Sequence, residues 1–189
     1  MTVFYTCALA TLVAAYIVFR RLARADYHHL RRLSPRTAGL QLMVFLGLFA
    51  LPYTFNPPAW PWFWLLAGPT SQEQQIAGLI AIVLGLMLAF GVMARFGWRR
   101  ALGLEVKGLV RSGLYRLTRN PQVLGGYLMV IGLALQWPSF DALTFIGVYG
   151  IAVHWMILSE EEHLLRVFGK EYAAYCQKTP RYFLFELRK

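Results

Sequence analysis

The chain has 189 residues, of which 58% are hydrophobic and only 15% are charged, and its mean hydropathy is +0.47. An ordinary soluble domain is less apolar, so the composition indicates an integral membrane protein. The net charge of +10 does not indicate nucleic-acid binding, because no basic module with interleaved aromatic residues accompanies it. We interpret the charge as a topology signal and as an attraction to the anionic headgroups of the lipid bilayer.

Several apolar runs approach the length of a membrane-spanning helix, for which about 17–25 residues are needed. In chain order they cover residues 3–19, 38–55, 76–94, 122–137 and 142–158. Only a short turn separates the last two runs, so we expect them to form a helical hairpin. The pattern predicts an all-α integral membrane helical bundle of about five transmembrane helices, forming a single transmembrane domain over residues 1–189.

The positions of the basic residues predict the orientation of this bundle. All 19 Lys and Arg residues lie in three groups, Arg20–Arg36, Arg95–Arg119 and Arg166–Lys189, whereas the connections 56–75 and 138–141 contain none. The positive-inside rule therefore predicts an N-terminus outside and a C-terminus in the cytoplasm. Arg20 and Arg21 follow the first apolar run rather than precede it, so we expect a mature helix there and not a signal peptide.

Two features inside the apolar runs admit more than one interpretation. Small residues recur every fourth position in the third run and favour close helix packing over a ligand pocket: Ala77, Ala81, Gly85 and Ala89. His154 lies within the fifth run, where an ionisable residue is either functional or a neutral imidazole bonded to a neighbouring helix. Cys7 and Cys176 are predicted on opposite sides of the membrane, so we expect neither a disulfide nor a metal site.

The candidate site lies at the ends of the predicted hairpin. Asn120-Pro121 is a typical helix start, with Asn as the cap and Pro at the first helical position, and a helix N-terminus favours an anion. Glu160-Glu161-Glu162 oppose the dipole at the other end of the hairpin and favour a cation. Together these ends complement a zwitterion such as an amino acid. Alternatively, the glutamates pair with Arg111, Arg119 or Arg166 on a solvated face.

Two motifs flank the hairpin and lead to a family resemblance. The first contains Gly113, Tyr115, Arg119, Pro121 and Gly125, in the spacing Gly-x-Tyr-x-x-x-Arg-His-Pro-x-Tyr-x-Gly. The second contains Glu160, Glu161, Leu164, Phe168, Gly169, Tyr172 and Tyr175, in the spacing Glu-Glu-x-x-Leu-x-x-x-Phe-Gly-x-x-Tyr-x-x-Tyr. Over residues 105–182 the chain thereby resembles the isoprenylcysteine carboxyl methyltransferase family, which is related to the phospholipid N-methyltransferases. Asn120, Val123 and Leu114 stand where the family carries His, Tyr and frequently Pro.

The resemblance implies S-adenosylmethionine bound by residues 105–182 at the cytoplasmic ends of the last two helices. The cofactor-binding residues it implies are Leu109, Val110, Gly113, Tyr115, Asn120, Pro121, Glu160 and Glu161. Leu109 and Val110 wall the adenosine, and the two glutamates hold the ammonium group. Arg119 is expected to position an anionic acceptor, with no residue needed as acid or base when the nucleophile is an ionised carboxylate.

The implied reaction is methyl transfer to a lipophilic acceptor, either an isoprenylcysteine-like carboxylate or a lipid headgroup. A second interpretation is an NADPH-dependent sterol or steroid reductase, a class that usually has Asn-Tyr after this proline and an acidic residue just beyond. Here Gln122 and Val123 follow the proline, and no acid occurs before Asp141. A third is a non-catalytic membrane scaffold that uses the small-residue stripe for helix association. The sequence leaves the acceptor and the oligomeric state open.

Overall fold

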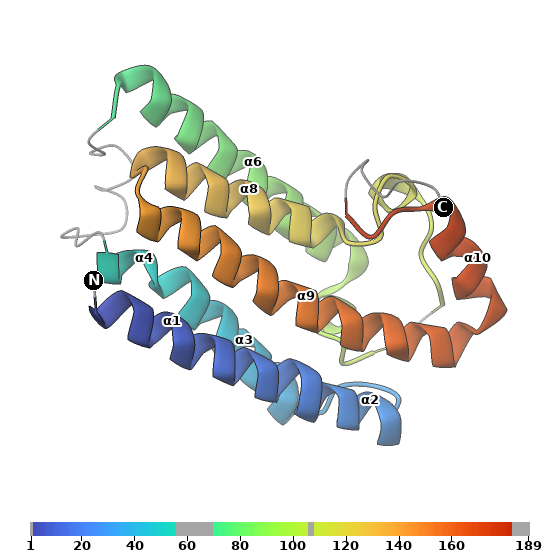
Figure 1. Cartoon of the computed structure of the whole chain (residues 1–189). Coiled ribbons are helices and arrows are strands. Elements are labelled where there is room, and N and C mark those ends of the chain that lie inside the picture. The colour runs from blue at the N-terminus through green and yellow to red at the C-terminus, as the bar shows by residue number, and fades with distance from the viewer. Residues whose placement is uncertain (1, 56–69, 106–107, 183–189) are drawn as a thin grey trace.

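A computed structural model describes residues 2–55, 70–105 and 108–182 (Figure 1). This part of the chain is helical with no strand, which confirms the all-α prediction. Its helices are α1 (Thr2–Ala15), η1 (Tyr16–Ala23), α2 (Arg24–His29), α3 (Pro35–Ala50), α4 (Pro52–Phe55), α6 (Gln72–Phe96), α7 (Trp98–Ala101), η2 (Gly113–Arg116), α8 (Pro121–Gln136), α9 (Phe140–Phe168) and α10 (Lys170–Lys178).

Four helical segments are long and apolar enough to cross a membrane: Thr2–His29, Pro35–Phe55, Gln72–Arg95 and Phe140–Phe168. Each contains one of the predicted apolar runs. The remaining run coincides with α8, which is apolar but has only 16 residues. The number of membrane crossings and their orientation therefore stay predictions. Ser139 accepts a hydrogen bond from the Ala142 amide at 3.0 Å and caps α9, which makes the turn of the α8–α9 hairpin short.

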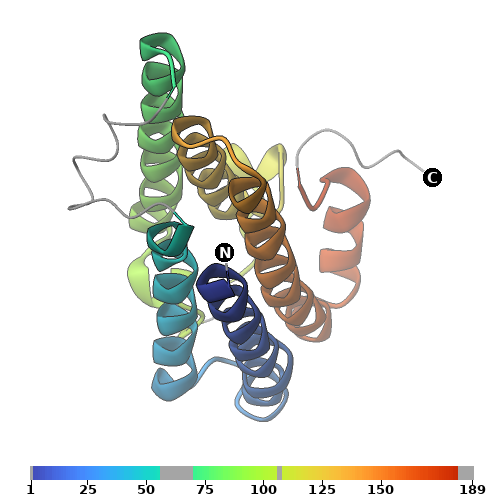
Figure 2. The ribbon, with the colours of Figure 1, turned by 60° about the vertical axis from the view of Figure 1, so that its left-hand side comes forward.

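The long helix α9 lies between two groups of helices, one formed by α1, η1 and α3 and the other by α6 and α8. It packs against α1 and η1 on one side and against α8 on the other, while α6 packs along α8 (Figure 2). The core where α1, α3 and α9 meet is built from fully buried apolar side chains, the largest of which are Phe4, Phe19, Leu48, Phe145 and Ile157. Because α9 belongs to both halves, residues at its C-terminal end are positioned by contacts from most of the bundle.

Glycines set the close approach of α6 to α8. A Cβ atom on Gly85 would lie 2.5 Å from the carbonyl oxygen of Gly125, and one on Gly132 would lie 2.6 Å from that of Gly78. Any larger side chain would separate the helices, so the predicted packing role of the small-residue stripe is confirmed at Gly85. The residues that face α8 are not all those of the predicted stripe, since Ala77 is exposed and its neighbour Gly78 faces α8 instead.

The first long helix contains a π-helical stretch, η1, which aims side chains at the end of α9. Arg20 donates hydrogen bonds to Ser159 Oγ and to Glu162 Oε1, each at 2.9 Å. Ser159 in turn donates to the Phe19 carbonyl at 2.8 Å. These contacts dock η1 beside the glutamate run and position it from the N-terminal half of the chain.

Candidate functional site

A cavity lies where the start of α8, the end of α9, α10 and the loop that follows α6 come together. Its walls include the predicted site residues Leu109, Val110, Tyr115, Arg119, Asn120, Glu160 and Glu161. Gly113 lies instead on a neighbouring groove, and Pro121 is buried as the first residue of α8. Segments separated by about 50 residues in the sequence therefore meet around one space.

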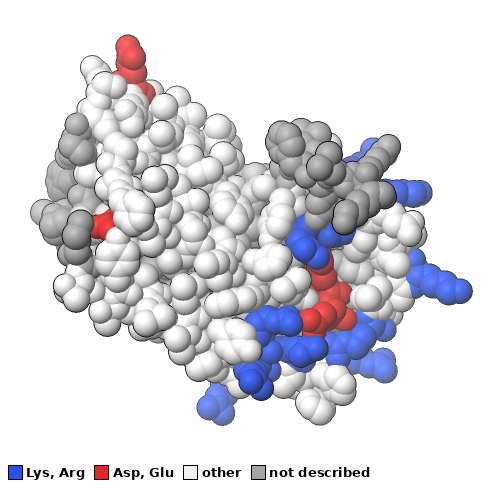
Figure 3. Space-filling model, in the orientation of Figure 1, with Lys and Arg blue, Asp and Glu red and all other residues white. Residues whose placement is uncertain are grey.

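Charge is concentrated at the same end of the molecule. In Figure 3 the visible Lys and Arg side chains gather around a cluster of acidic residues at this end, while the opposite end shows acidic groups without cations beside them. Members of all three basic groups meet there, since Arg20, Arg119 and Arg181 each pair with Glu161 or Glu162.

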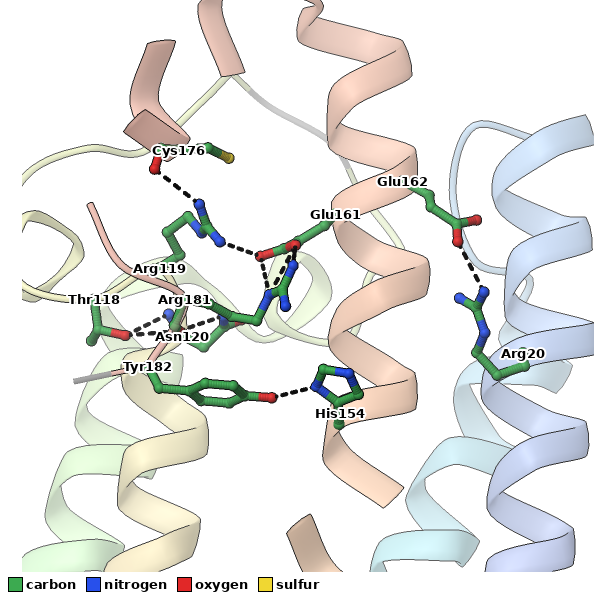
Figure 4. Close-up of polar contacts among 10 residues, drawn as sticks. All are labelled: Arg20, Thr118, Arg119, Asn120, His154, Glu161, Glu162, Cys176, Arg181 and Tyr182. Carbon is green, nitrogen blue, oxygen red and sulfur yellow. Dashed lines mark hydrogen bonds and ion pairs between the residues drawn. The ribbon is translucent and has the colours of Figure 1, made fainter. Parts of the chain in front are cut away.

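The three consecutive glutamates have different surroundings. Glu161 pairs with Arg119 at 3.0 Å and with Arg181 at 2.7 Å, as Figure 4 shows. Glu162 faces the other way and pairs with Arg20 at 2.9 Å and with Arg24. The alternative in which the glutamates pair with arginines therefore describes these two, with Arg119 the one partner that was predicted.

Glu160 differs from its neighbours because it lines the cavity and its side chain is open to it. Within residues 2–55, 70–105 and 108–182, it forms no hydrogen bond or ion pair. A cavity-lining carboxylate that forms no ion pair can attract a positively charged ligand group. Of the three consecutive glutamates, Glu160 is thus the one left available to a ligand.

Arg119 is a buried cross-link with only 7% of its side chain exposed. Besides its ion pair with Glu161, its Nη1 donates to the Cys176 carbonyl at 3.2 Å, and its backbone amide donates to the Pro180 carbonyl at 2.9 Å. Its Nε atom has no partner in the described part of the chain. Arg119 therefore fastens α8 to α9 and α10 and keeps one donor unused beside the cavity.

Asn120 occupies the capping position of α8, and Pro121 is the first helical residue, as predicted. The prediction that the Asn120 side chain caps the helix is wrong. Its Nδ2 donates instead to the Arg181 carbonyl at 2.9 Å, with backbone angles φ −131° and ψ 61° that differ from an ordinary cap. The side chain therefore fastens the C-terminal segment to the start of α8.

That C-terminal segment, residues 179–182, is the main feature that sequence reasoning missed. Arg119 binds the Pro180 carbonyl of this segment and Asn120 binds the Arg181 carbonyl, which also accepts a hydrogen bond from Thr118 Oγ1 at 3.1 Å. Tyr182 Oη lies 2.8 Å from His154 Nδ1 (Figure 4). The intramembrane histidine thus has a partner, which comes from this segment rather than from a neighbouring helix.

Tyrosines close the cavity between η2 and α10. Tyr175 donates to the Tyr115 carbonyl at 2.6 Å, and Gln122 Nε2 lies 3.4 Å from Tyr115 Oη. Burial raises the pKa of Tyr175 to about 12 and raises the pKa of Tyr115 and Tyr172 above the ordinary range, with the nearby Glu160 carboxylate adding to the shift at Tyr115. These phenols stay neutral at physiological pH and act only through hydrogen bonds and apolar contact.

Tyr27 and His163 also line the cavity and were not predicted. Tyr27 comes from the N-terminal helix, and no sequence signal connects it to the motifs. His163 follows the glutamates directly, so its proximity could have been expected from helical spacing. Within the described residues, no cluster of three or more His, Cys, Asp or Glu side chains is arranged to hold a metal ion.

Comparison with known families gives one match. A family model described as phospholipid methyltransferase matches residues 74–171, more than half of the chain. The matched range runs from the first turn of α6 to the start of α10 and so contains most of the cavity walls. Neither the curated proteins nor the solved structures include a match.

Proposed function

The chain belongs to the phospholipid methyltransferase family, and on this premise we propose that it transfers a methyl group from S-adenosylmethionine to a lipophilic acceptor. The apolar helices and the family match make it a membrane methyltransferase. Beyond this, we propose the identity of the cofactor, the class of the acceptor and the side of the membrane on which the site lies. The acceptor is an isoprenylcysteine-like carboxylate or a lipid headgroup, and the site faces the cytoplasm, where the basic residues gather.

The observation that carries the proposal is the unpaired Glu160 carboxylate opposite the N-terminus of α8 in one cavity. The amino acid half of S-adenosylmethionine bears an ammonium and a carboxylate. Glu160 complements the ammonium, and the helix N-terminus complements the carboxylate. The unused Nε donor of the buried Arg119 supports an anion at this position. The Glu160 carboxylate and the Arg119 Nε donor, which have no partner among the described residues, therefore fit a zwitterion.

Glu161 has a supporting part in this proposal. Its carboxylate is shared by two arginines, so the group formed by Arg119, Glu161 and Arg181 carries a net positive charge. This charge lies beside Glu160 and favours a ligand with both signs over a simple cation. Glu161 thus holds Arg119 in place rather than contacting the ammonium itself.

When bound, S-adenosylmethionine supplies a methyl group on a positively charged sulfur. The chain's residues bind, orient and exclude water. Glu160 fixes the amino acid end, Leu109 and Val110 give an apolar wall for the adenosine, and Tyr115 with Tyr175 closes the space between η2 and α10. An in-line displacement by an ionised carboxylate needs positioning and dehydration more than acid–base chemistry, whereas an amine headgroup must first give its proton to a base.

The proposed cofactor region is larger than residues 105–182, because Tyr27, Arg100 and Gly103 also line the cavity. The N-terminal helix is thereby part of the site. The acceptor is proposed to enter from the bilayer, since the helices that surround the site expose large apolar side chains along their length.

Equilibrium binding to the purified full chain in lipid nanodiscs tests the proposal. We expect S-adenosylmethionine and S-adenosylhomocysteine to bind and NADPH not to bind. Methyl-labelled cofactor should then label a lipophilic acceptor, with farnesylcysteine and mixed phospholipids assayed in parallel. Binding of NADPH alone would support the reductase interpretation, and binding of neither cofactor would support the scaffold.

A further inference from the structure

His163 is a buried polar residue in the cavity whose hydrogen-bonding capacity the protein does not use fully. It lies on α9 one turn beyond Glu160, is 2% exposed and lines the cavity. Its Nε2 atom has no partner among the residues that the structure describes. A buried ring nitrogen without a partner is costly unless a ligand satisfies it.

The ring of His163 is held firmly by Tyr27. The two rings stack with centroids 4.4 Å apart and planes 10° apart. On the far side, Gly103 allows the loop after α7 to approach Tyr27, because a Cβ at Gly103 would lie 3.0 Å from Tyr27 Oη. The orientation of the imidazole is therefore fixed by the fold.

The ring nitrogen without a partner among the described residues is Nε2. A neutral imidazole with its proton on Nδ1 presents a lone pair at Nε2 and can only accept there. In this tautomer His163 offers an acceptor that requires a donor from the ligand.

We propose that His163 recognises the adenine base of the cofactor, its Nε2 accepting a hydrogen bond from the base's 6-amino group. The inference rests on the proposed function and extends it to the nucleoside. Glu160 and His163 stand three residues apart on one face of α9, so a single helix wall carries a charged acceptor and a neutral one.

The other donors of the cofactor match His163 less well. The ammonium group gains far more from the carboxyl group of Glu160, whose ionised form it stabilises, than from an imidazole ring. The ribose hydroxyls both donate and accept, so polar cavity residues such as Glu105 and Arg100 can serve them. The 6-amino group only donates, and within an apolar wall formed by Leu109 and Val110 it needs an acceptor such as Nε2.

The test compares two ligands on the full chain in nanodiscs: S-adenosylhomocysteine and its analogue in which hydrogen replaces the 6-amino group. We expect the parent protein to bind the analogue about tenfold more weakly, the effect of one lost hydrogen bond. His163→Phe keeps a ring to stack on Tyr27 and removes the lone pair, so it should bind both ligands equally. His163→Gln restores an acceptor and should regain part of the preference.

His154→Phe is the matched control, since it makes the same change on the same helix away from the cavity lining, and it should keep the parent's preference. Equal binding of the two ligands to the parent would overturn the assignment, and this measurement does not depend on any variant folding. So would a full preference retained in His163→Phe. If S-adenosylhomocysteine does not bind the parent at all, the proposed function itself fails, which is a distinct result.

Discussion

Exchanging Glu160 and Glu161 separately for Gln tests the division of roles between these neighbours. Glu160 forms no contact that the described structure would lose, so Glu160→Gln should leave the thermal stability unchanged. It removes the charge that the cofactor's ammonium would meet. A hydrogen bond to a charged group contributes about 1.5–3 kcal/mol, and the lower value applies because Glu160 is open to solvent. We expect the Kd for S-adenosylmethionine to rise about tenfold.

Glu161→Gln should show the opposite pattern. The Glu161 side chain is 15% exposed and faces Arg119, which is 7% exposed. Removing one charge from a buried ion pair leaves the other uncompensated, at a cost of about 3 kcal/mol. The variant should therefore melt at a clearly lower temperature. Its cofactor affinity should fall less than that of Glu160→Gln when both are measured well below the melting transition.

Thermal unfolding and calorimetric cofactor binding, measured in the same nanodiscs, separate these effects. Glu162→Gln is the control, because it removes the same charge from the face of α9 that points away from the cavity. The reasoning would be refuted if Glu160→Gln bound cofactor like the parent. It would also be refuted if Glu161→Gln lost affinity at unchanged stability, because Glu161 would then be the direct ligand.

Three further predictions concern packing, the helix start and topology. Gly85→Ala places a methyl group 2.5 Å from a backbone oxygen and should destabilise the chain by about 1–3 kcal/mol. Gly91→Ala is the control and should not destabilise it, because Gly91 has open space around it. Equal melting temperatures of the two variants would contradict the α6–α8 contact. Asn120→Ala removes the bond to the Arg181 carbonyl and should cost about 1 kcal/mol, while Asn120→His, which retains a donor, should keep more cofactor binding. A reporter fused after Lys189 should be cytoplasmic and one inserted near Thr70 external, and finding both on one side would exclude the predicted orientation.

The sequence predicted the helices well, because apolar length and charge placement are properties of single segments. It also predicted that Asn120-Pro121 starts a helix, since proline's fixed backbone angle acts locally. The role of the Asn120 side chain was missed for the opposite reason. Its partner, the Arg181 carbonyl, is a backbone group far along the chain, and no residue type marks such an acceptor.

The same limit explains the packing stripe. Small residues at every fourth position identified the third run as a packing helix, but the stripe could not be given its register without the partner helix. The structure pairs Gly78 with Gly132 and Gly85 with Gly125, a spacing of seven residues, or about two turns, along each helix. Ala77 resembles its neighbours in sequence and still faces outward.

The glutamate run shows why three identical residues could not be assigned from sequence. Consecutive residues of an α-helix are rotated by about 100°, so each of the three side chains points to a different part of the bundle. Glu162 meets η1 and α2, Glu161 meets Arg119 and Arg181, and Glu160 meets the cavity. Four arginines thus more than neutralise the two carboxylates that would otherwise oppose the helix dipole. The third carboxylate has no partner among the described residues, and in our proposal it meets the ammonium group of a zwitterionic ligand whose carboxylate answers the remaining positive charge.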